Sequence, residues 1–295
     1  MTVAGPRPGG REPGAAHASL PSGIVVALSP WVCRIVAPNP GPMTGPGTNT
    51  YLVGDPFDGP LVVIDPGPDD EGHLDAVAAA GAGRIGTIVC THTHLDHWPG
   101  TPGLVARTGA EVAAHPGAEG LVVDRALVDG DVVADAGDWR LVAVHTPGHA
   151  SNHLCFLLEP EGWLFTGDHV MDGSTVVIRP PDGDMTQYLD ALDRIAELGT
   201  ARLVPGHGEP IDDPAARLDG LRRHRLAREA QVEELLVSDG PIGVTDLAGM
   251  AYPDVPEVLV PMAQASTWAH LRRLAQHGRA VSDEPDEPHG TWRVS

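Results

Sequence analysis

The sequence predicts an α/β protein with a mixed α/β body over residues 21–212 and a smaller helical domain over residues 213–282. Two observations predict this division. Short apolar runs recur through the first part and are separated by Gly, Pro and Asp, which is typical of strands that end in turns. After Pro210 such runs stop, and charged and apolar residues alternate without a strand-like stretch. We therefore expect two domains of unequal size in the 295 residues.

The two ends of the chain have the composition of flexible tails. Residues 1–20 are rich in Gly, Pro and Ala, and residues 283–295 are rich in Asp, Glu and Pro. Residues 1–20 lack the apolar stretch of a signal peptide, and no other run is long enough to span a membrane. We therefore expect a soluble protein without a membrane partner.

Within the body, eight apolar runs are the predicted strands, with helices between some of them. The clearest helix covers Asp184–Gly199, where apolar residues keep helical spacing. Asp184 can cap this helix, and Gln187 three residues later completes a capping box. The predicted strands are Ile24–Leu28, Tyr51–Val53, Leu61–Ile64, Ile88–Cys90, Leu141–Val144, Leu154–Leu158, Trp163–Phe165 and Arg202–Val204.

The helical domain begins with a strong start signal. Asp213 followed by Pro214 places a capping residue before a proline at the first helical position. This helix should run to about Val237, and residues 241–282 suggest two or three short helices and a closing hairpin. The last helix is expected to end at Gly278, a residue that favours helix termination, and to cover Gln264–His277.

Charge and cysteine content exclude several classes of function and of site. The formal net charge is −21, from 40 acidic and 19 basic residues, which argues against a protein whose whole surface attracts nucleic acid. The three cysteines (Cys33, Cys90 and Cys155) are too few and too scattered for a disulfide framework or a cysteine zinc site. A reducing, cytoplasmic compartment is therefore expected.

One short segment carries four potential metal ligands, His92, His94, Asp96 and His97. All four are residue types that bind zinc or iron well. His92 and His94 are two residues apart, so on an extended backbone their side chains point the same way. Asp96 and His97 then lie where the chain turns, and Pro99 suits the first turn of a helix. One ion could take the first two histidines, and a second ion could take the aspartate and the third histidine.

Three later segments offer further ligands, His149, Asp168 and His207. Each follows a strand-like run, and strand ends meet at one edge of an α/β sheet. The glycine that precedes each ligand lets backbone and metal approach closely. The alternative is that some of the 15 histidines cluster by accident in surface loops. The shared placement of four distant segments favours a metal site instead.

Seven ligands predict two divalent transition-metal ions, with Zn²⁺ as the expected metal and a hydroxide that bridges them. Asp168 has two carboxylate oxygens and can bridge both ions, and Asp96 and Asp168 are the candidate catalytic residues. The hydroxide would attack an electrophilic carbonyl carbon or phosphorus, and the metals would stabilise the oxyanion. In this interpretation one ion is bound by His92, His94 and His149, and the other by Asp96, His97 and His207.

The His-x-His-x-Asp-His pattern of residues 92–97 resembles the metallo-β-lactamase superfamily. This resemblance implies an αββα sandwich with the metals at one edge of the sheets. Further segments resemble the group called β-lactamase-like protein 2, whose small winged-helix-like appendage the helical domain resembles. The resemblance covers about residues 39–280. It rests on residues 39–41, 47–54, 146–149, 166–168, 173–176, 205–208, 222–224 and 270–274.

The resemblance implies an endoribonuclease that acts on single-stranded RNA, while close relatives are thioesterases that act on carrier-bound acyl chains. Asp168 stands where the best-known zinc β-lactamases carry Cys, so antibiotic hydrolysis is not the expected role. Pro99 stands where many relatives carry Gly, which alters the start of the helix. Only 39 positions separate Asp168 from His207, too few for the nucleic-acid domain inserted in RNA-processing nucleases of the superfamily.

Other side chains near the ligands have two interpretations. Asp65 could orient a ligand-bearing loop, or it could simply form a turn before Pro66. His145, His153 and His169 could donate a proton to a leaving group. We favour a supporting role for these three histidines, because metal sites carry many supporting groups.

The candidate substrate-binding residues are Ser174, Thr175, Arg222 and Arg223. The two hydroxyls could hydrogen-bond a phosphate or carbonyl, or they could cap turns. Residues 217–228 contain five Arg and one acid, a local reversal of the charge of the chain. This cluster could steer RNA phosphates or a phosphopantetheine carrier towards the site. The alternative, which we favour slightly, is a solvated helix face with acidic partners.

Three functions remain open. A metal-dependent hydrolase that cleaves single-stranded RNA is favoured by the resemblance and the Arg cluster. A hydrolase of thioesters or small esters uses the same metal chemistry and agrees with the acidic composition. A nucleic-acid-binding regulator would use the helix over residues 264–277, as winged helices do. The sequence leaves the oligomeric state open.

Overall fold

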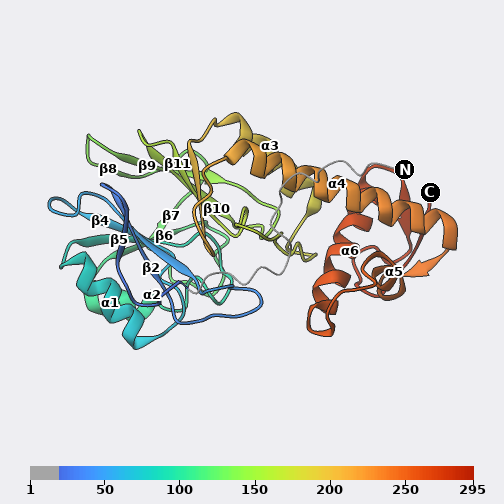
Figure 1. Ribbon diagram of the computed structural model, residues 1–295, viewed down its shortest axis with the longest axis horizontal. Helices are drawn as coiled ribbons and strands as arrows, with labels where there is room; N and C mark the ends of the chain where they lie inside the picture. The colour runs from blue at the N-terminus through green and yellow to red at the C-terminus, as the bar shows by residue number, and fades with distance from the viewer. Residues whose placement is uncertain (1–19) are drawn as a thin grey trace, which may run out of the picture.

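The computed structural model describes residues 20–295, in which two packed sheets carry helices on their outer faces and a C-terminal appendage follows (Figure 1). Every predicted strand overlaps an observed one. The strands of the body are β1 Val26–Ser29, β2 Val32–Val36, β3 Asn49–Val53, β4 Leu61–Ile64, β5 Ile85–Val89, β6 Glu111–Ala114, β7 Arg125–Ala126, β8 Val132–Asp135, β9 Arg140–His145, β10 Leu154–Glu159, β11 Trp163–Gly167 and β12 Arg202–Pro205. The predicted N-terminal tail lies outside the described residues, except for Leu20.

The first sheet has seven strands in the order β1-β2-β3-β4-β5-β6-β7. Strands β1 to β4 are antiparallel neighbours, and β4 to β7 are parallel neighbours. Parallel neighbours need a crossover connection. Helices α1 (Glu71–Gly81) and α2 (Thr101–Thr108) supply it between β4 and β5 and between β5 and β6. Asp70 caps α1 by accepting a hydrogen bond from the backbone N–H of His73.

The second sheet has five strands in the order β12-β11-β10-β9-β8, and only β11 and β12 are parallel neighbours. Its inner face packs against the inner face of the first sheet. Tyr51 and Ile64 of the first sheet lie in one buried cluster with Leu141 and Phe156 of the second. The ring of Tyr51 also lies 5.1 Å from that of Phe165. This shared core holds the two sheets together.

Helices cover both outer faces of the sandwich (Figure 1). Leu74 of α1 and Leu104 of α2 pack on the first sheet. Helix α3 (Met185–Glu197) packs on the second sheet through Tyr188 and Leu192. Asp184 caps α3 by accepting a hydrogen bond from the backbone N–H of Gln187, at the position that the sequence predicts. The layers are therefore α, β, β and α, which confirms the predicted fold class.

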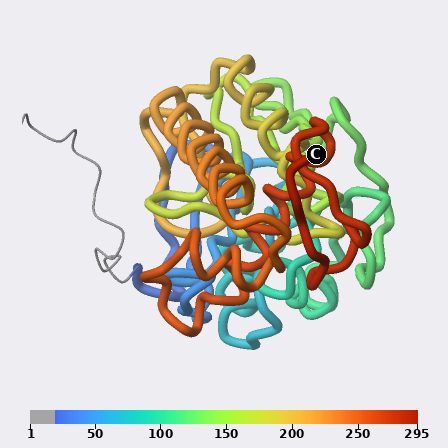
Figure 2. The backbone as a smooth tube through the Cα atoms, turned by 90° about the vertical axis from the view of Figure 1, so that its right-hand side faces the viewer, coloured from blue at the N-terminus to red at the C-terminus, as the bar shows by residue number. Residues whose placement is uncertain are grey.

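The appendage has its own core and its own small sheet. Its helices are α5 (Val244–Ala251) and α6 (Val260–Gln276), separated by a 3-10 turn at Glu257–Leu259. Helix α6 begins four residues before the predicted start. Figure 2, turned by 90° from the first view, shows the appendage in front of the body. The strands are β13 Ile242–Gly243, β14 Ala280–Ser282 and β15 Thr291–Val294, in the order β13-β15-β14.

This sheet corrects the prediction that residues 283–295 form a flexible tail. Strand β15 pairs with both β13 and β14 and is therefore the central strand. Trp292 on β15 is 0% exposed and packs with Val232, Leu271 and Leu274. Composition alone predicts a tail here because acids and prolines fill residues 283–288, whereas the residues that form the strand are few. The predicted closing hairpin is confirmed, and its second strand lies in the supposed tail.

Helix α4 (Pro214–Asp239) joins the two parts. It begins where the sequence predicts, with Asp213 accepting a hydrogen bond from the backbone N–H of Ala216. Leu218 and Leu221, in its first half, pack with the core under the second sheet. Val232 and Leu236, in its second half, pack in the core of the appendage. The core of the body thus extends into α4, beyond the predicted boundary at residue 212.

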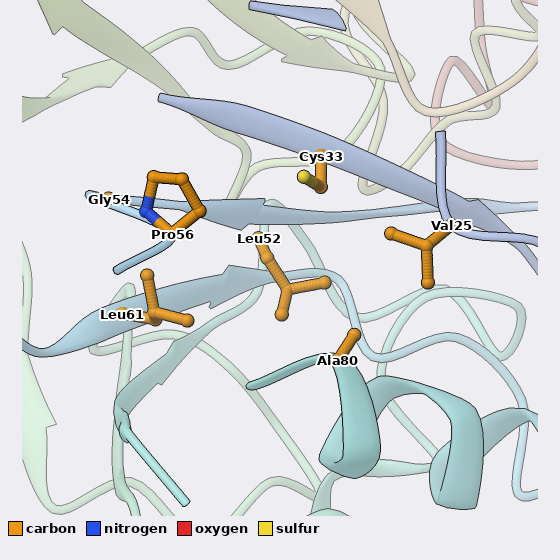
Figure 3. Close-up of a pocket in the computed structure, with 7 residues that line it drawn as sticks. All are labelled: Val25, Cys33, Leu52, Gly54, Pro56, Leu61 and Ala80. Carbon is orange, nitrogen blue, oxygen red and sulfur yellow. The ribbon is translucent and has the colours of Figure 1, made fainter. Parts of the chain in front are cut away.

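Two further features of the described residues bear on function. No helix among residues 20–295 is long and apolar enough to cross a membrane. A small apolar cavity of about 40 Å³ lies between the first sheet and α1, and Cys33, Leu52 and Ala80 are among its lining residues (Figure 3). The lining comes from the outer side of the first sheet, so this cavity is not a site for the predicted metal chemistry.

Candidate metal centre

The seven predicted ligands all follow the carboxyl ends of strands. His92, His94, Asp96 and His97 follow β5, and the other three ligands follow β9, β11 and β12. Strands β9, β11 and β12 run in one direction in the second sheet. Their carboxyl ends therefore lie at one edge of the sandwich, where the end of β5 also lies. The structure brings all seven residues together at this edge, in two groups that share Asp168.

The first group consists of His92, His94, His149 and Asp168, whose nearest ligand atoms all lie within 4.8 Å of one another. The Nδ1 atom of His94 lies 2.9 Å from His92 Nε2 and 2.9 Å from His149 Nε2. His149 Nε2 lies 3.7 Å from Asp168 Oδ2. Three imidazole nitrogens and one carboxylate oxygen thus converge on one position.

The second group consists of Asp96, His97, Asp168 and His207, again within 4.8 Å. His97 Nε2 lies 3.4 Å from Asp168 Oδ1 and 3.5 Å from Asp96 Oδ2. His207 Nε2 lies 3.3 Å from Asp168 Oδ1 and 3.1 Å from Asp96 Oδ2. The two oxygens of Asp168 therefore face different groups, Oδ2 the first and Oδ1 the second.

The unsatisfied atoms of this cluster fit a cation. His97 Nε2, His207 Nε2 and Asp168 Oδ1 are buried and have no hydrogen-bond partner among the described residues. Buried polar atoms are almost always paired, so three orphaned atoms that face one another require another partner. Imidazole nitrogen and carboxylate oxygen are the donor types that zinc, iron and manganese accept.

Burial leaves the histidines of the first group neutral. Burial, followed by the neighbouring His97, holds the pKa of His92 well below its usual value. Burial also lowers the pKa of His149 to about 4, against a smaller opposing effect of Asp168. Neutral imidazole is the form that binds metal. These nitrogens therefore have lone pairs available for a cation near neutral pH.

The second group has the opposite electrostatic character. Burial alone would lower the pKa of His97, but Asp168, Asp65 and Asp96 together raise it well above its usual value. The pKa of His207 is raised in the same way, against burial, by Asp168 and Asp96. In the protein alone, positive charge on these histidines balances the buried carboxylates. A bound cation would take over that role.

Asp65 contacts His97 and also lies in a turn, so both interpretations of this residue apply. It is 1% exposed and accepts hydrogen bonds from the backbone N–H and the hydroxyl of Thr91, at 2.7 and 2.8 Å. Its Oδ2 atom also lies 2.8 Å from His97 Nδ1. Asp65 adopts a left-handed backbone conformation with φ 52°, an uncommon state for a residue other than glycine. The turn and the supporting role are thus combined in one residue.

Backbone carbonyls orient two other ligands. His149 Nδ1 lies 2.7 Å from the carbonyl oxygen of Val177, and His207 Nδ1 lies 3.2 Å from that of Gly47. A carbonyl can only accept, so each Nδ1 carries the proton and each Nε2 keeps its lone pair for the cluster. Gly206 is required beside these ligands, because a Cβ there would lie 2.9 Å from His97 and 3.1 Å from Asp168 Oδ1.

Of the three other histidines, His153 lies nearest the candidate ligands, with its ring 5.1 Å from that of His92. His153 and His169 are 0% exposed, and their rings lie 5.8 Å apart. Burial lowers the pKa of His169 to about 3. His145 stacks on the ring of His115 at 4.8 Å, at the end of β9.

The predicted substrate-binding residues come from two elements, the segment after Asp168 and helix α4. Ser174 and Thr175 are exposed on the segment that follows Asp168. Arg222 and Arg223 are exposed on α4, and each pairs with an acid: Arg222 with Asp193 at 2.8 Å and Arg223 with Asp219 at 2.9 Å. The neighbouring Arg217, Arg225 and Arg228 donate to backbone carbonyl oxygens.

Arg179 is a candidate that the sequence argument missed. Its side chain is exposed and forms no hydrogen bond or ion pair within residues 20–295, whereas every other arginine of that range forms at least one. It belongs to the same segment as Ser174 and Thr175. Its sequence context, an isolated Arg before two prolines, carries no charge pattern that would have distinguished it.

Two family descriptions match the chain in the order in which the structure shows its parts. The description "Metallo-beta-lactamase superfamily" matches residues 43–207, more than half of the chain, and the range contains all seven predicted ligands. The chain belongs to the metallo-β-lactamase superfamily. The description "Beta-lactamase associated winged helix domain" matches residues 244–292, which confirms the predicted winged-helix appendage. The protein is a metal-dependent hydrolase of the metallo-β-lactamase fold.

Two of the similar proteins have names that point to different functions. A β-lactamase-like protein 2 homolog from Drosophila melanogaster is 30% identical over 293 residues, covering 89% of this chain and 94% of that protein. An atrochrysone carboxyl ACP thioesterase from Aspergillus fumigatus is 35% identical over 217 residues, covering 70% of this chain and 65% of that protein. The resemblance to the β-lactamase-like protein 2 group is thereby confirmed.

Solved structures share the whole architecture. A metallo-β-lactamase family protein from Thermus thermophilus has a TM-score of 0.73 and 25% identity, with 91% of this chain and 100% of that chain covered. A β-lactamase domain protein from Burkholderia ambifaria has a TM-score of 0.77 and 21% identity, with 93% and 94% covered. The second likeness shows the fold alone.

Proposed function

We propose that this metallo-β-lactamase superfamily hydrolase works with two divalent cations, Zn²⁺ in the first instance. The observation that carries this proposal is the pair of four-residue groups that share Asp168. A single tetrahedral ion needs four protein ligands at most, so seven ligands in two groups are too many for one. The residues that would hold the cations are His92, His94, His149 and Asp168 in the first group, and Asp96, His97, Asp168 and His207 in the second.

The chain's own residues would place the cations and admit the substrate. When bound, divalent cations polarise a carbonyl or phosphoryl oxygen and lower the pKa of an attacking water. Asp168 would hold the two positions together through its two oxygens. His94 and Leu95 are exposed and Asp96 is partly exposed, whereas His97 is buried. Substrate would therefore approach over the turn at residues 94–96.

For the substrate, we propose an acyl thioester. The Arg cluster of α4 had favoured RNA, but its side chains are engaged by acids and carbonyl oxygens. The net charge of −21 also opposes a polyanion. Leu95 is 76% exposed beside two candidate ligands, an apolar contact suited to an acyl chain. The similarity to an ACP thioesterase supports the same substrate class.

Single-stranded RNA is the second candidate. It is supported by the nearly full-length similarity to a β-lactamase-like protein 2 homolog and by the exposed, unpaired guanidinium of Arg179 in the described part of the chain. A regulator that reads DNA with α6 has less support, because Ala265–Leu271 are all buried against the rest of the protein. The cytoplasmic location stays a prediction.

Parallel assays would test the proposal. The full chain, stripped of metal and reloaded with Zn²⁺, is given an acyl-pantetheine thioester and a single-stranded RNA of mixed sequence, with Asp168→Asn as the matched control. We expect thioester cleavage that needs metal and is lost in the control. RNA cleavage without thioester cleavage would mean that RNA is the substrate, and the proposed metal chemistry would stand. Failure of the folded chain to bind Zn²⁺ would refute the metal centre itself.

A further inference from the structure

The segment that follows Asp168, residues 171–178, is held by two arginines of helix α4. It has no regular secondary structure, so its carbonyl oxygens are not paired in a sheet or helix. Arg217 of α4 donates from Nε and Nη2 to the carbonyl oxygen of Met171, at 3.0 and 2.6 Å, and also to that of Ser174. Arg225, two turns further along α4, donates to the carbonyl oxygen of Val176.

The next carbonyl along the segment holds a metal-ligand candidate. The oxygen of Val177 lies 2.7 Å from Nδ1 of His149 and accepts a hydrogen bond from it. This hydrogen bond selects the tautomer of His149 whose Nε2 lone pair faces His94 and Asp168. The carbonyls of Val176 and Val177 are adjacent, so a shift of the peptide that Arg225 holds would move the acceptor of His149.

Arg225 is buried between the segment and helix α3. It is 3% exposed, and its guanidinium lies 5.2 Å from the centre of the Tyr188 ring of α3. Burial of a guanidinium is costly unless its N–H groups are bonded, so the contact with Val176 is not interchangeable with water. Tyr188 in turn packs against the ligand loop, because a Cβ on Gly148 would lie 2.4 Å from its backbone. Arg223 on the same helix is exposed and pairs only within the helix.

We propose that Arg225, assisted by Arg217, is a positioning residue for His149, through which the docking of α4 on the body sets the metal affinity of the first ligand group. The proposal rests on the two-cation site proposed above. Arg217 and Arg225 belong to the Arg cluster of residues 217–228. Under this proposal they act on the buried metal site and not on a substrate at the surface. No hydrogen bond among residues 20–295 joins this segment to Asp96, His97 or His207, so the affinity of the second group should depend much less on Arg225.

The test is a Zn²⁺ titration of the metal-stripped full chain in competition with a chromophoric chelator. For Arg225→Gln we expect one of two zinc equivalents to bind about 10–100-fold more weakly, the usual effect of losing a residue that orients a ligand, while the other keeps its affinity. Arg225→Lys should recover part of the loss, because it keeps a charged donor. Arg223→Gln, from the exposed face of the same helix, is the matched control and should keep both affinities.

Arg217→Gln serves as a second variant with the same expected selectivity, should Arg225→Gln not fold as judged by circular dichroism. Two unchanged equivalents in the folded Gln variants would overturn the positioning role and leave the two-cation site standing. Equal weakening of both equivalents would also overturn it, because a general loss of stability has no preference for one group. A wild-type chain that binds no zinc would overturn both proposals.

Discussion

The two ligand groups share Asp168 but reach their geometry by different means. The first group has three imidazoles and one carboxylate, and burial keeps His92 and His149 neutral. The second has two carboxylates and two imidazoles, and its carboxylates raise the pKa values of His97 and His207. A cation would satisfy lone pairs in the first group and would replace positive charge on the histidines in the second.

The groups that orient the histidines also differ in charge between the two ligand groups. A neutral backbone carbonyl, that of Val177, orients His149 in the first group. A buried carboxylate, that of Asp65, orients His97 in the second. One edge of the sandwich thus brings together two groups of candidate ligands that differ in charge. Imidazoles suit zinc, whereas carboxylates also suit manganese, so the second group should be less selective.

The largest effect should come from Asp168→Asn, because this residue alone belongs to both groups. We expect hydrolysis of the true substrate to fall by more than about 100-fold, since even residues that only orient a ligand contribute about 10–100-fold. Zinc content should fall below two equivalents, measured by elemental analysis. Far-UV circular dichroism should stay unchanged. A variant that keeps full activity would show that Asp168 does not join the two positions.

A matched pair, His149→Ala and His207→Ala, should separate the groups. Each variant should lose one equivalent of zinc and keep the other, because each histidine belongs to a single group. Mn²⁺ should still bind His149→Ala, whose two carboxylates at the second position remain, more tightly than it binds His207→Ala. Isothermal titration with both metals measures this. Loss of both equivalents in both variants would mean that the groups form one indivisible site.

A smaller effect is expected for Asp65→Asn. The variant keeps the size of the side chain but loses the charge that faces His97, so the second group should bind zinc about 10–100-fold more weakly. The first group should be affected less, because Asp65 reaches it only through the hydroxyl of Thr91, which lies 3.0 Å from His92 Nδ1. Asp58→Asn, in an exposed surface turn, is the control and should match the wild type. Competition titration would contradict the assignment if Asp65→Asn weakened the first group instead.

The smallest effect is expected for the double change of Arg222 and Arg223 to Ala. Both pairs, with Asp193 and Asp219, are exposed. Exposed ion pairs contribute little, so the free energy of unfolding in urea should change by less than about 1 kcal/mol. Both zinc equivalents should remain. Loss of either equivalent would show that the metal groups depend on the outer face of α4 as well as on its buried arginines.

The appendage cannot be removed at the boundary that the sequence predicts. Leu218 and Leu221 of α4 belong to the core under the second sheet, so deletion from residue 213 would expose that core. Arg217 and Arg225 would be lost together with the carbonyls they hold. A truncation there would test the stability of the body as much as the role of the winged helix, which makes single substitutions on α4 the sharper experiments.

The sequence by itself predicted the ligands and most elements that carry them. His92, His94, Asp96 and His97 form a local pattern. The other candidate ligands follow apolar runs that can be recognised from the local sequence alone. Caps such as Asp184 and Asp213 were predictable for the same reason, because a cap and its helix are adjacent in the chain. Strand ends of one direction must meet at one edge, so placing the ligands together required only the fold class.

Only the tertiary structure decided which side chains face inwards. Arg217 and Arg225 lie in the same charged run as Arg222 and Arg223, and composition treats all four alike. Whether a guanidinium meets a carbonyl oxygen or solvent depends on residues more than 40 positions away, such as Val176 for Arg225. Trp292 is buried for the same reason, since its neighbours come from α4 and α6. Sequence patterns report local periodicity, whereas burial is set by long-range packing.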